Sequence, residues 1–184
     1  MMQIDDNDYV AVICEGSSEV TVINMLLDGG HLCFGRGQLI SEDVLPSTYF
    51  RNPQQFVDRY LTMDYAGAKI HVFLIQDRKD VRYKIKSPYL DKIRVITYVV
   101  TAPEIEMLII HSLGLYNQYK KRSSKIKPSV FLAEELGMRS SEIKSCNYVK
   151  EFFADHDLLT AIREHKKKAP KLGKGEVFLA DLLV

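Results

Sequence analysis

The alternation of apolar and polar positions predicts strands and helices that follow each other along the first hundred residues. Unbroken apolar runs are typical of strands that are covered on both faces. We place such strands at residues 9–14, 31–34, 69–76 and 93–100. Helices are expected between them, one over 20–27 that Gly29 and Gly30 stop, and one that Asn52 caps with Pro53 at its first position. This order predicts an α/β fold with a mostly parallel, four-stranded sheet flanked by helices.

The remaining chain is predicted to be helical. Thr101 and Glu104 have the spacing of a capping box, so a helix is expected from there to about Tyr119. Further helices are expected at 128–136, 141–155, 157–168 and 176–184. The predicted organisation is therefore an α/β core over 1–119 and a helical extension over 120–184 that packs on it.

Composition narrows the class of protein without identifying a function. The 184 residues are 46% hydrophobic and 27% charged, with a net charge of +1, which is ordinary for a globular domain. The three cysteines form no CxxC pair, so the sequence predicts reduced thiols and a cytoplasmic location. The acidic N-terminus does not resemble a signal peptide, and no apolar run is as long as a membrane span, so no membrane partner is expected.

Acidic side chains follow three of the predicted strands. Glu15 follows the first, Asp77 the strand at 69–76, with Asp80 three residues further, and Glu104 follows the strand at 93–100. Parallel strands present their carboxyl ends at one edge of a sheet, where ligands commonly bind. Clustered carboxylates favour hard cations such as Mg²⁺ or Mn²⁺, which can stabilise a phosphoryl group during transfer or hydrolysis. The plainer interpretations are that Glu15 sits at a helix N-terminus and that Glu104 only caps a helix.

Two stretches carry a family resemblance, YVAVICEGSSE at 9–19 and VFLIQD at 72–77. An apolar strand followed by Glu-Gly and a helix, and then an apolar strand that ends in Asp, resembles the Toprim domain. That domain occurs in bacterial primases, topoisomerases and nucleases of the overcoming-lysogenisation-defect type. The resemblance covers about residues 9–104 and is closest to small stand-alone Toprim-like proteins of prokaryotes. It implies a Toprim/Rossmann-like sheet.

The resemblance also implies a metal site. In the family, a glutamate after the first strand and an Asp-x-Asp pair hold Mg²⁺, and the glutamate can serve as a general acid or base. Glu15 and Asp77 match the first two positions, whereas Lys79 occupies the third. Either Asp80 substitutes after a shift of the turn, or metal binding is weakened. Some relatives carry a further glutamate after the fourth strand, for which Glu104 is preferred here over Glu106.

Basic residues surround the predicted site. The segments 78–94, 120–127 and 163–174 hold most of the lysines and arginines. Beside an acidic metal site, such residues can neutralise a nucleic-acid backbone. The expected phosphate contacts are Arg78, Lys79, Arg82, Lys84 and Lys86. Tyr83 and Tyr89 could stack on unpaired bases. The alternative for the last two segments is a solvated surface.

The sequence therefore predicts Mg²⁺-dependent phosphodiester chemistry on nucleic acid, with a nuclease as the leading hypothesis. Glu15, Asp77, Asp80 and Glu104 are its candidate catalytic residues, and the first three are its candidate metal ligands. By resemblance, the setting would be phage defence or mobile-element biology. The alternatives are a catalytically degraded binding or regulatory module and an effector that depends on a partner such as an ATPase. Homo-oligomerisation is compatible with each.

Overall fold

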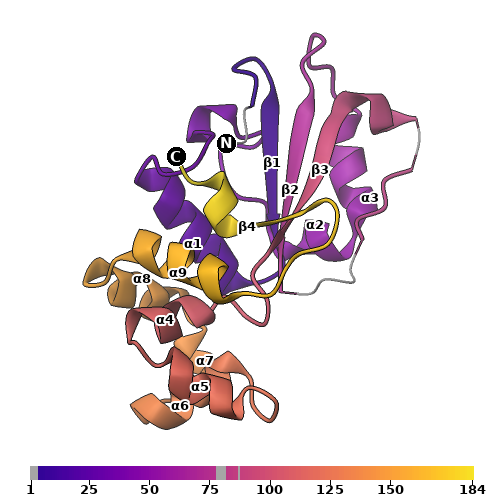
Figure 1. Ribbon diagram of the computed structural model, residues 1–184. Coiled ribbons are helices and arrows are strands. Elements are labelled where there is room, and N and C mark those ends of the chain that lie inside the picture. The colour runs from indigo at the N-terminus through magenta and orange to yellow at the C-terminus, as the bar shows by residue number, and fades with distance from the viewer. Residues whose placement is uncertain (1–3, 78–81, 87) are drawn as a thin grey trace.

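A computed structural model describes residues 4–77, 82–86 and 88–184 and contains one parallel sheet (Figure 1). Its strands are β1 (Tyr9–Cys14), β2 (Ile70–Gln76), β3 (Ile93–Val100) and β4 (Glu176–Phe178). They lie in the order β1-β2-β3-β4, and each neighbouring pair is parallel. The predicted α/β fold with a four-stranded parallel sheet and flanking helices is confirmed.

The membership of the sheet differs from the prediction at two places. Residues 31–34 do not form a strand, because their pairing within the described chain is limited to an isolated antiparallel bridge between Leu32 and Leu183. The Leu32 side chain is buried and packs in the core. The fourth strand is β4, in a segment that was predicted to be helical. Gly175, with φ of +81°, precedes this strand, and Val177 then pairs with Val99 of β3. The C-terminal segment thus completes the sheet of the core.

A loop covers the free edge of β1. Leu39 and Leu45 form isolated parallel bridges to that strand. The amide of Ile40 donates to the Val10 carbonyl at 2.9 Å, and the amide of Leu45 donates to the Val12 carbonyl at 2.8 Å. Exposed strand edges invite pairing with other chains. This loop satisfies part of the edge without forming a regular strand.

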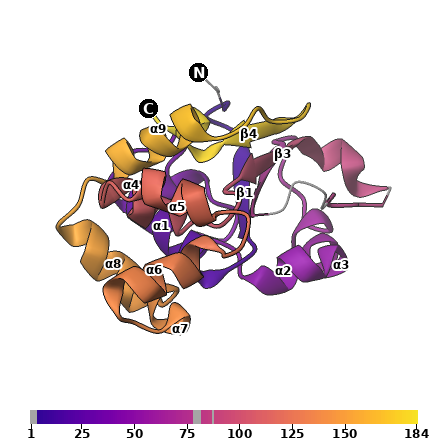
Figure 2. The ribbon, with the colours of Figure 1, turned by 60° about the horizontal axis from the view of Figure 1, so that its bottom comes forward.

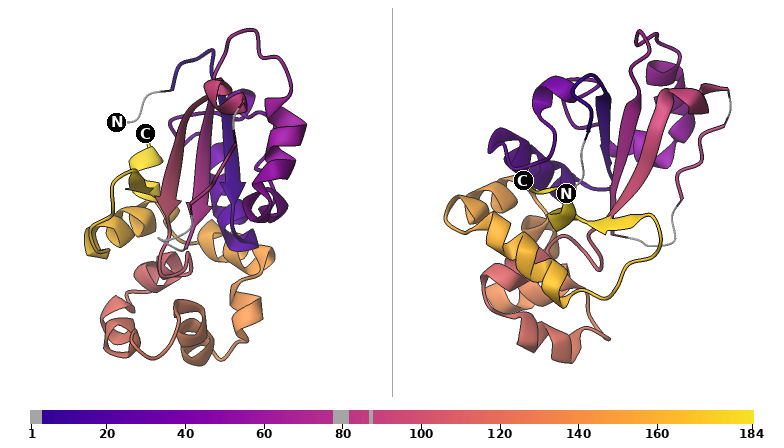
Figure 3. Two further views of the ribbon diagram at one scale, coloured as in Figure 1. Left: turned by 90° about the vertical axis from the view of Figure 1, so that its right-hand side faces the viewer. Right: turned by 45° about the horizontal axis from the view of Figure 1, so that its top comes forward.

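Helices cover both faces of the sheet, as the edge-on view of Figure 3 shows. They are α1 (Ser17–Asp28), α2 (Ser47–Arg51), α3 (Pro53–Phe56), a π-helical turn (Val57–Leu61), α4 (Met107–Ser112), α5 (Tyr116–Arg122), α6 (Pro128–Leu136), α7 (Ser140–Ile143), α8 (Cys146–Ala154) and α9 (Leu158–Lys168). Short 3-10 helices span Arg36–Gln38, Tyr89–Lys92 and Leu179–Leu182.

Alternate residues of the strands enter two separate cores, as the pleat of a strand requires. Val10, Val12 and Cys14 of β1 pack in the core that contains α1, α4 and α9. Ala11 and Ile13 face the opposite core, which α3 and the π-helical turn cover. The Asn52 cap is confirmed, since its side chain accepts from the amide of Gln54 at 3.2 Å. Burial on both faces explains why the strands read as continuous apolar runs.

A group of helices, α4 to α8, lies beyond the carboxyl ends of the strands, on the opposite side from α2 and α3 (Figure 2).

The predicted capping box at Thr101 is wrong. Helix α4 begins only at Met107, and the carboxylate of Glu104 accepts hydrogen bonds from Ser129 in α6 and from Lys144 after α7 rather than capping its own helix. The basic segment 120–127 is helical in part, since its first three residues end α5. Within the described ranges, none of the helices combines the length and apolar character needed to cross a membrane.

Candidate functional site

The two acids at the ends of β1 and β2 meet at the carboxyl edge of the sheet. Cys14 pairs with Ile75, so Glu15 and Asp77 leave neighbouring strands at almost the same level. The Glu15 amide donates to the Ile75 carbonyl at 2.9 Å, which continues the ladder by one bond. The Asp77 amide then donates to Oε2 of Glu15 at 3.2 Å. This contact joins residues that lie 62 positions apart in the chain.

A pocket of about 170 Å³ opens at this edge. We call it the acidic pocket. Its lining consists of Glu15, Gly16, Ser17, Ser18, Glu19, Asp77, Glu104, Glu106 and Lys144. Five carboxyl groups thus face one ammonium group. The acids come from the ends of β1 and β2, from the first turn of α1 and from the loop after β3, and the lysine comes from the connection between α7 and α8.

Gly16 allows the first turn of α1 to close over the pocket. Its backbone is extended, with φ of −134°, so the position does not require glycine for a left-handed conformation. A Cβ atom at Gly16 would instead lie 2.6 Å from Oε2 of Glu19. The absence of a side chain therefore makes room for the Glu19 carboxylate.

Glu19 is a buried acid in an unfavourable setting. Burial raises the pKa of its carboxyl to about 7, and the negative charges of Glu106, Asp77 and Glu15 add to the rise. The Glu19 carboxylate also accepts a hydrogen bond from its own backbone amide, which offsets only part of this rise in the pKa. Its pKa places the change in protonation close to neutral pH.

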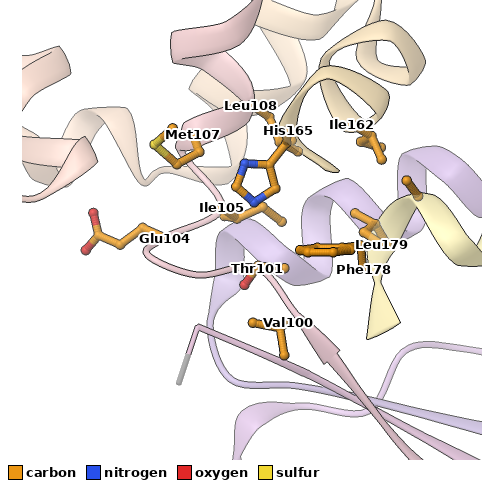
Figure 4. Close-up of a pocket in the computed structure, with 11 residues that line it drawn as sticks. Val100, Thr101, Glu104, Ile105, Met107, Leu108, Ile162, His165, Phe178 and Leu179 are labelled. Atoms are coloured by element: carbon orange, nitrogen blue, oxygen red, sulfur yellow. The ribbon is translucent and has the colours of Figure 1, made fainter. Parts of the chain in front are cut away.

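Glu104 is paired with cations of the C-terminal segment. Its Oε1 lies 2.7 Å from Nζ of Lys144 and 3.9 Å from that of Lys127, and its Oε2 accepts from the amide of Ser129 at 3.0 Å. Burial raises the pKa of Glu104, but the hydrogen bonds from Lys144 and Ser129 outweigh it and hold the pKa below its ordinary value. Figure 4 shows its carboxylate pointing away from the apolar side chains around His165.

Glu106 is the second acid of the loop after β3. It accepts a hydrogen bond from the Ser18 hydroxyl at 2.9 Å, which ties this loop to the start of α1. Burial raises its pKa, although the positive charge of Lys144 opposes the rise. The loop therefore brings both Glu104 and Glu106 to the pocket, whereas the sequence favoured Glu104 alone.

The metal ligands expected from the sequence are described only in part. Arg78, Lys79 and Asp80 lie outside the described residues. Over residues 4–77, 82–86 and 88–184, no three His, Cys, Asp or Glu side chains lie close enough together to hold a metal ion. Glu15 and Asp77 are the two predicted ligands that the structure brings together.

The described basic residues of the 78–94 segment alternate with buried ones. Lys84 and Lys86 are exposed, and Arg82 forms an ion pair with Glu176 at 3.0 Å and lies over the Tyr98 ring. Tyr83 points inward and its hydroxyl donates to the Tyr49 carbonyl at 2.8 Å. The prediction that Tyr83 stacks on bases is therefore wrong, while Tyr89 remains half-buried with Lys92 over its ring.

Comparison with known proteins yields no family. Neither protein-family models nor curated proteins nor solved structures match this chain. The Toprim resemblance therefore stays a hypothesis that rests on the two stretches at 9–19 and 72–77.

Two residues of the pocket carried no recognisable signal in the sequence. Lys144 lies in the polar stretch SSEIKSC, far from any predicted strand end. Glu19 has the spacing of a capping residue, and the glycine three positions before it is the one hint of a close approach. Only the folded chain shows that both reach the same edge of the sheet.

Proposed function

We propose that the protein hydrolyses phosphodiester bonds of nucleic acid with the help of Mg²⁺ or Mn²⁺, and that the acidic pocket is its active site. One observation carries this proposal: Glu15 and Asp77 end adjacent parallel strands and are joined there by the Asp77 amide. Ligand sites of open parallel sheets lie at this edge.

The donor atoms of the pocket suit a hard cation. Mg²⁺ is usually bound through one or two carboxylates, with water and substrate phosphate oxygens completing the shell. Glu15 and Asp77 would hold it, so a cage of three protein ligands is not required. When bound, the ion would stabilise negative charge on the phosphoryl group.

The other residues of the pocket would orient the site and balance its charge. Lys144 neutralises Glu104, and its positive charge opposes the rise that burial causes in the pKa of Glu106. Its ammonium group is also a partner for a substrate phosphate that approaches the pocket. Lys84 and Lys86 are exposed and can contact the nucleic-acid backbone without reading its sequence.

The test is a cleavage assay on labelled single- and double-stranded DNA and RNA across a Mg²⁺ and Mn²⁺ titration. Glu15→Gln is expected to abolish cleavage and to weaken metal binding in isothermal titration calorimetry. Glu151→Gln removes an exposed acid outside the pocket and is expected to change neither. If the unaltered protein binds no Mg²⁺ or Mn²⁺ and cleaves no substrate, the enzyme proposal is refuted.

One observation favours a second candidate, a non-catalytic binding or regulatory module. Lys144 already lies 2.7 Å from Glu104 and provides a resident positive charge within the acidic pocket. A module of this kind, with or without an ATPase partner, would bind nucleic acid in the presence of EDTA and cleave none of it. The same assay therefore separates the two candidates.

A further inference from the structure

A second cavity borders the same loop that brings Glu104 and Glu106 to the acidic pocket. It has a volume of about 300 Å³ and lies between α5, α9 and residues 102–107. We call it the loop cavity. Its size is at the lower end of the range that proteins use for small organic ligands.

The walls of the loop cavity are aromatic and apolar. Tyr116 and Tyr119 line it from α5, Met107 from the start of α4, and the rings of Pro103 and Pro170 from the adjoining loops. Flat rings and a thioether are the groups that pack well against an aromatic ligand. The lining therefore favours a planar ring over a branched aliphatic chain.

Two lysines stand at the border of the loop cavity. Lys120 lies in the last turn of α5, and Lys168 ends α9 with its Nζ 5.7 Å from the centre of the Tyr116 ring. Both are exposed, and neither forms an ion pair with any residue that the structure describes. The basic segments 120–127 and 163–174, which the sequence singled out separately, thus meet at one cavity. Their charge suits an anionic group such as a phosphate.

A buried histidine lies at the inner side of the loop cavity. His165 is 9% exposed, and among the described residues neither of its ring nitrogens forms a well-aligned hydrogen bond, although the backbone of Ala102 lies close enough to the ring to favour its protonated form. Burial, helped by electrostatic repulsion between the two rings when His111 is protonated, lowers the pKa of His165 to about 4. The imidazole is therefore neutral near pH 7 and offers one donor and one acceptor. Figure 4 shows its ring beside Met107, which lines the same cavity.

Buried polar atoms without partners are uncommon and call for an explanation. The aromatic walls, the two lysines and the buried histidine together suggest an explanation, which is a ligand that contacts all three. An aromatic base carries donors and acceptors on its edge, a planar face for the walls, and a phosphate at the far end of the molecule.

We propose that the loop cavity is a nucleotide-binding site, in which the base packs against Tyr116 and Met107 and the phosphate is held by Lys120 and Lys168. In this arrangement the base edge reaches His165. A nucleotide at the end of a nucleic-acid strand offers the same chemistry as a free nucleotide. The site does not depend on the proposed nuclease activity, because it uses none of the carboxylates of the acidic pocket.

The test is isothermal titration of the full chain, in EDTA, with AMP, GMP, CMP and UMP. At least one nucleotide is expected to bind with a Kd below 1 mM, and the corresponding nucleoside and inorganic phosphate are each expected to bind at least tenfold more weakly. A short oligonucleotide is titrated in parallel. Tighter binding of the oligonucleotide would assign the site to a strand end, and weaker or equal binding would assign it to the free nucleotide. Failure of all four nucleotides to bind would overturn the proposal.

Variants separate a binding role from a structural one. The double variant Lys120→Gln/Lys168→Gln is expected to weaken nucleotide binding at least tenfold. Lys121→Gln/Lys167→Gln removes the same charge from the same helices outside the cavity and is its matched control. Lysines at helix C-termini also stabilise the helix dipole, so equal losses in the two double variants would refute the assignment.

The histidine has its own variant. His165→Leu keeps a buried side chain of similar size and removes both ring nitrogens, which lack a well-aligned hydrogen bond, so thermal stability is expected to hold or rise while nucleotide affinity falls. Unchanged affinity in a stable His165→Leu protein would refute contact between the base and the imidazole. Glu15→Gln is expected to bind nucleotide as the unaltered protein does, which keeps this test separate from that of the nuclease.

Discussion

Glu19→Gln is expected to stabilise the protein, and to do so only where the carboxyl group would be charged. The folded state raises the pKa of Glu19 from 4.5 to about 7, mainly through burial. A raised carboxyl pKa means that the charged form opposes folding. The loss of folding free energy caused by the buried charge is absent below about pH 4.5, grows as the pH rises, and reaches its full value above about pH 7. At 1.36 kcal/mol per pKa unit, its full value is about 3 kcal/mol.

The assay is urea unfolding of both proteins between pH 5 and pH 8, in EDTA so that no bound cation offsets the charge. The gain in free energy of unfolding from Glu19→Gln is expected to be small at pH 5 and to reach about 3 kcal/mol at pH 8. Glu151→Gln, at an exposed position, is the control and is expected to show no such trend. A gain that is the same at pH 5 and pH 8 would show that Glu19 is not held as an unfavourable buried acid.

Three further substitutions test contacts of the site and its surroundings. Lys144→Met leaves the Glu104 carboxylate buried without its closest cation. After allowance for the partial exposure of the lysine, this substitution is expected to lower the free energy of unfolding by about 1–2 kcal/mol at pH 7. Adding Glu104→Gln should recover part of this loss, and a loss that stays the same in the double variant would contradict the pairing. Gly16→Ala is expected to cost about 1 kcal/mol in urea unfolding because its Cβ meets the Glu19 carboxylate, and the cost should vanish in a Glu19→Ala background. Tyr83→Phe is expected to cost about 1 kcal/mol, from a lost hydrogen bond to a main-chain carbonyl, with nucleic-acid binding unchanged; weaker binding would mean that this tyrosine reaches the ligand after all.

The apolar runs were sufficient to predict the centre of the sheet. β1 and β2 are buried on both faces and β3 is buried toward its end, so their sequences are rich in apolar residues and recognisable without an alignment. β4 has three half-buried residues at the edge, a pattern that does not differ from the first turn of a helix. Short edge strands are decided by the partner strand rather than by their own sequence.

The candidate site was predictable where it depends on strand ends and unpredictable where it depends on tertiary contacts. Glu15 and Asp77 follow directly from the parallel arrangement of β1 and β2. Glu104 has the spacing of a helix-capping residue, but its carboxylate instead accepts a hydrogen bond from Lys144, forty positions later in the chain. Lys144 itself obeys no local rule, because its position is set by how α7 and α8 pack.

The late position of β4 in the chain has a consequence for folding. The last strand pairs with β3 only after the chain has passed through six helices, between Val100 and Glu176. Closing so long a loop costs entropy before any strand contact compensates for it, so the pairing is expected to form late. While the ribosome is still synthesising the helices, the outer edge of β3 has no partner strand within its own chain. That interval, rather than the finished protein, is when this sheet is most exposed to pairing with another molecule.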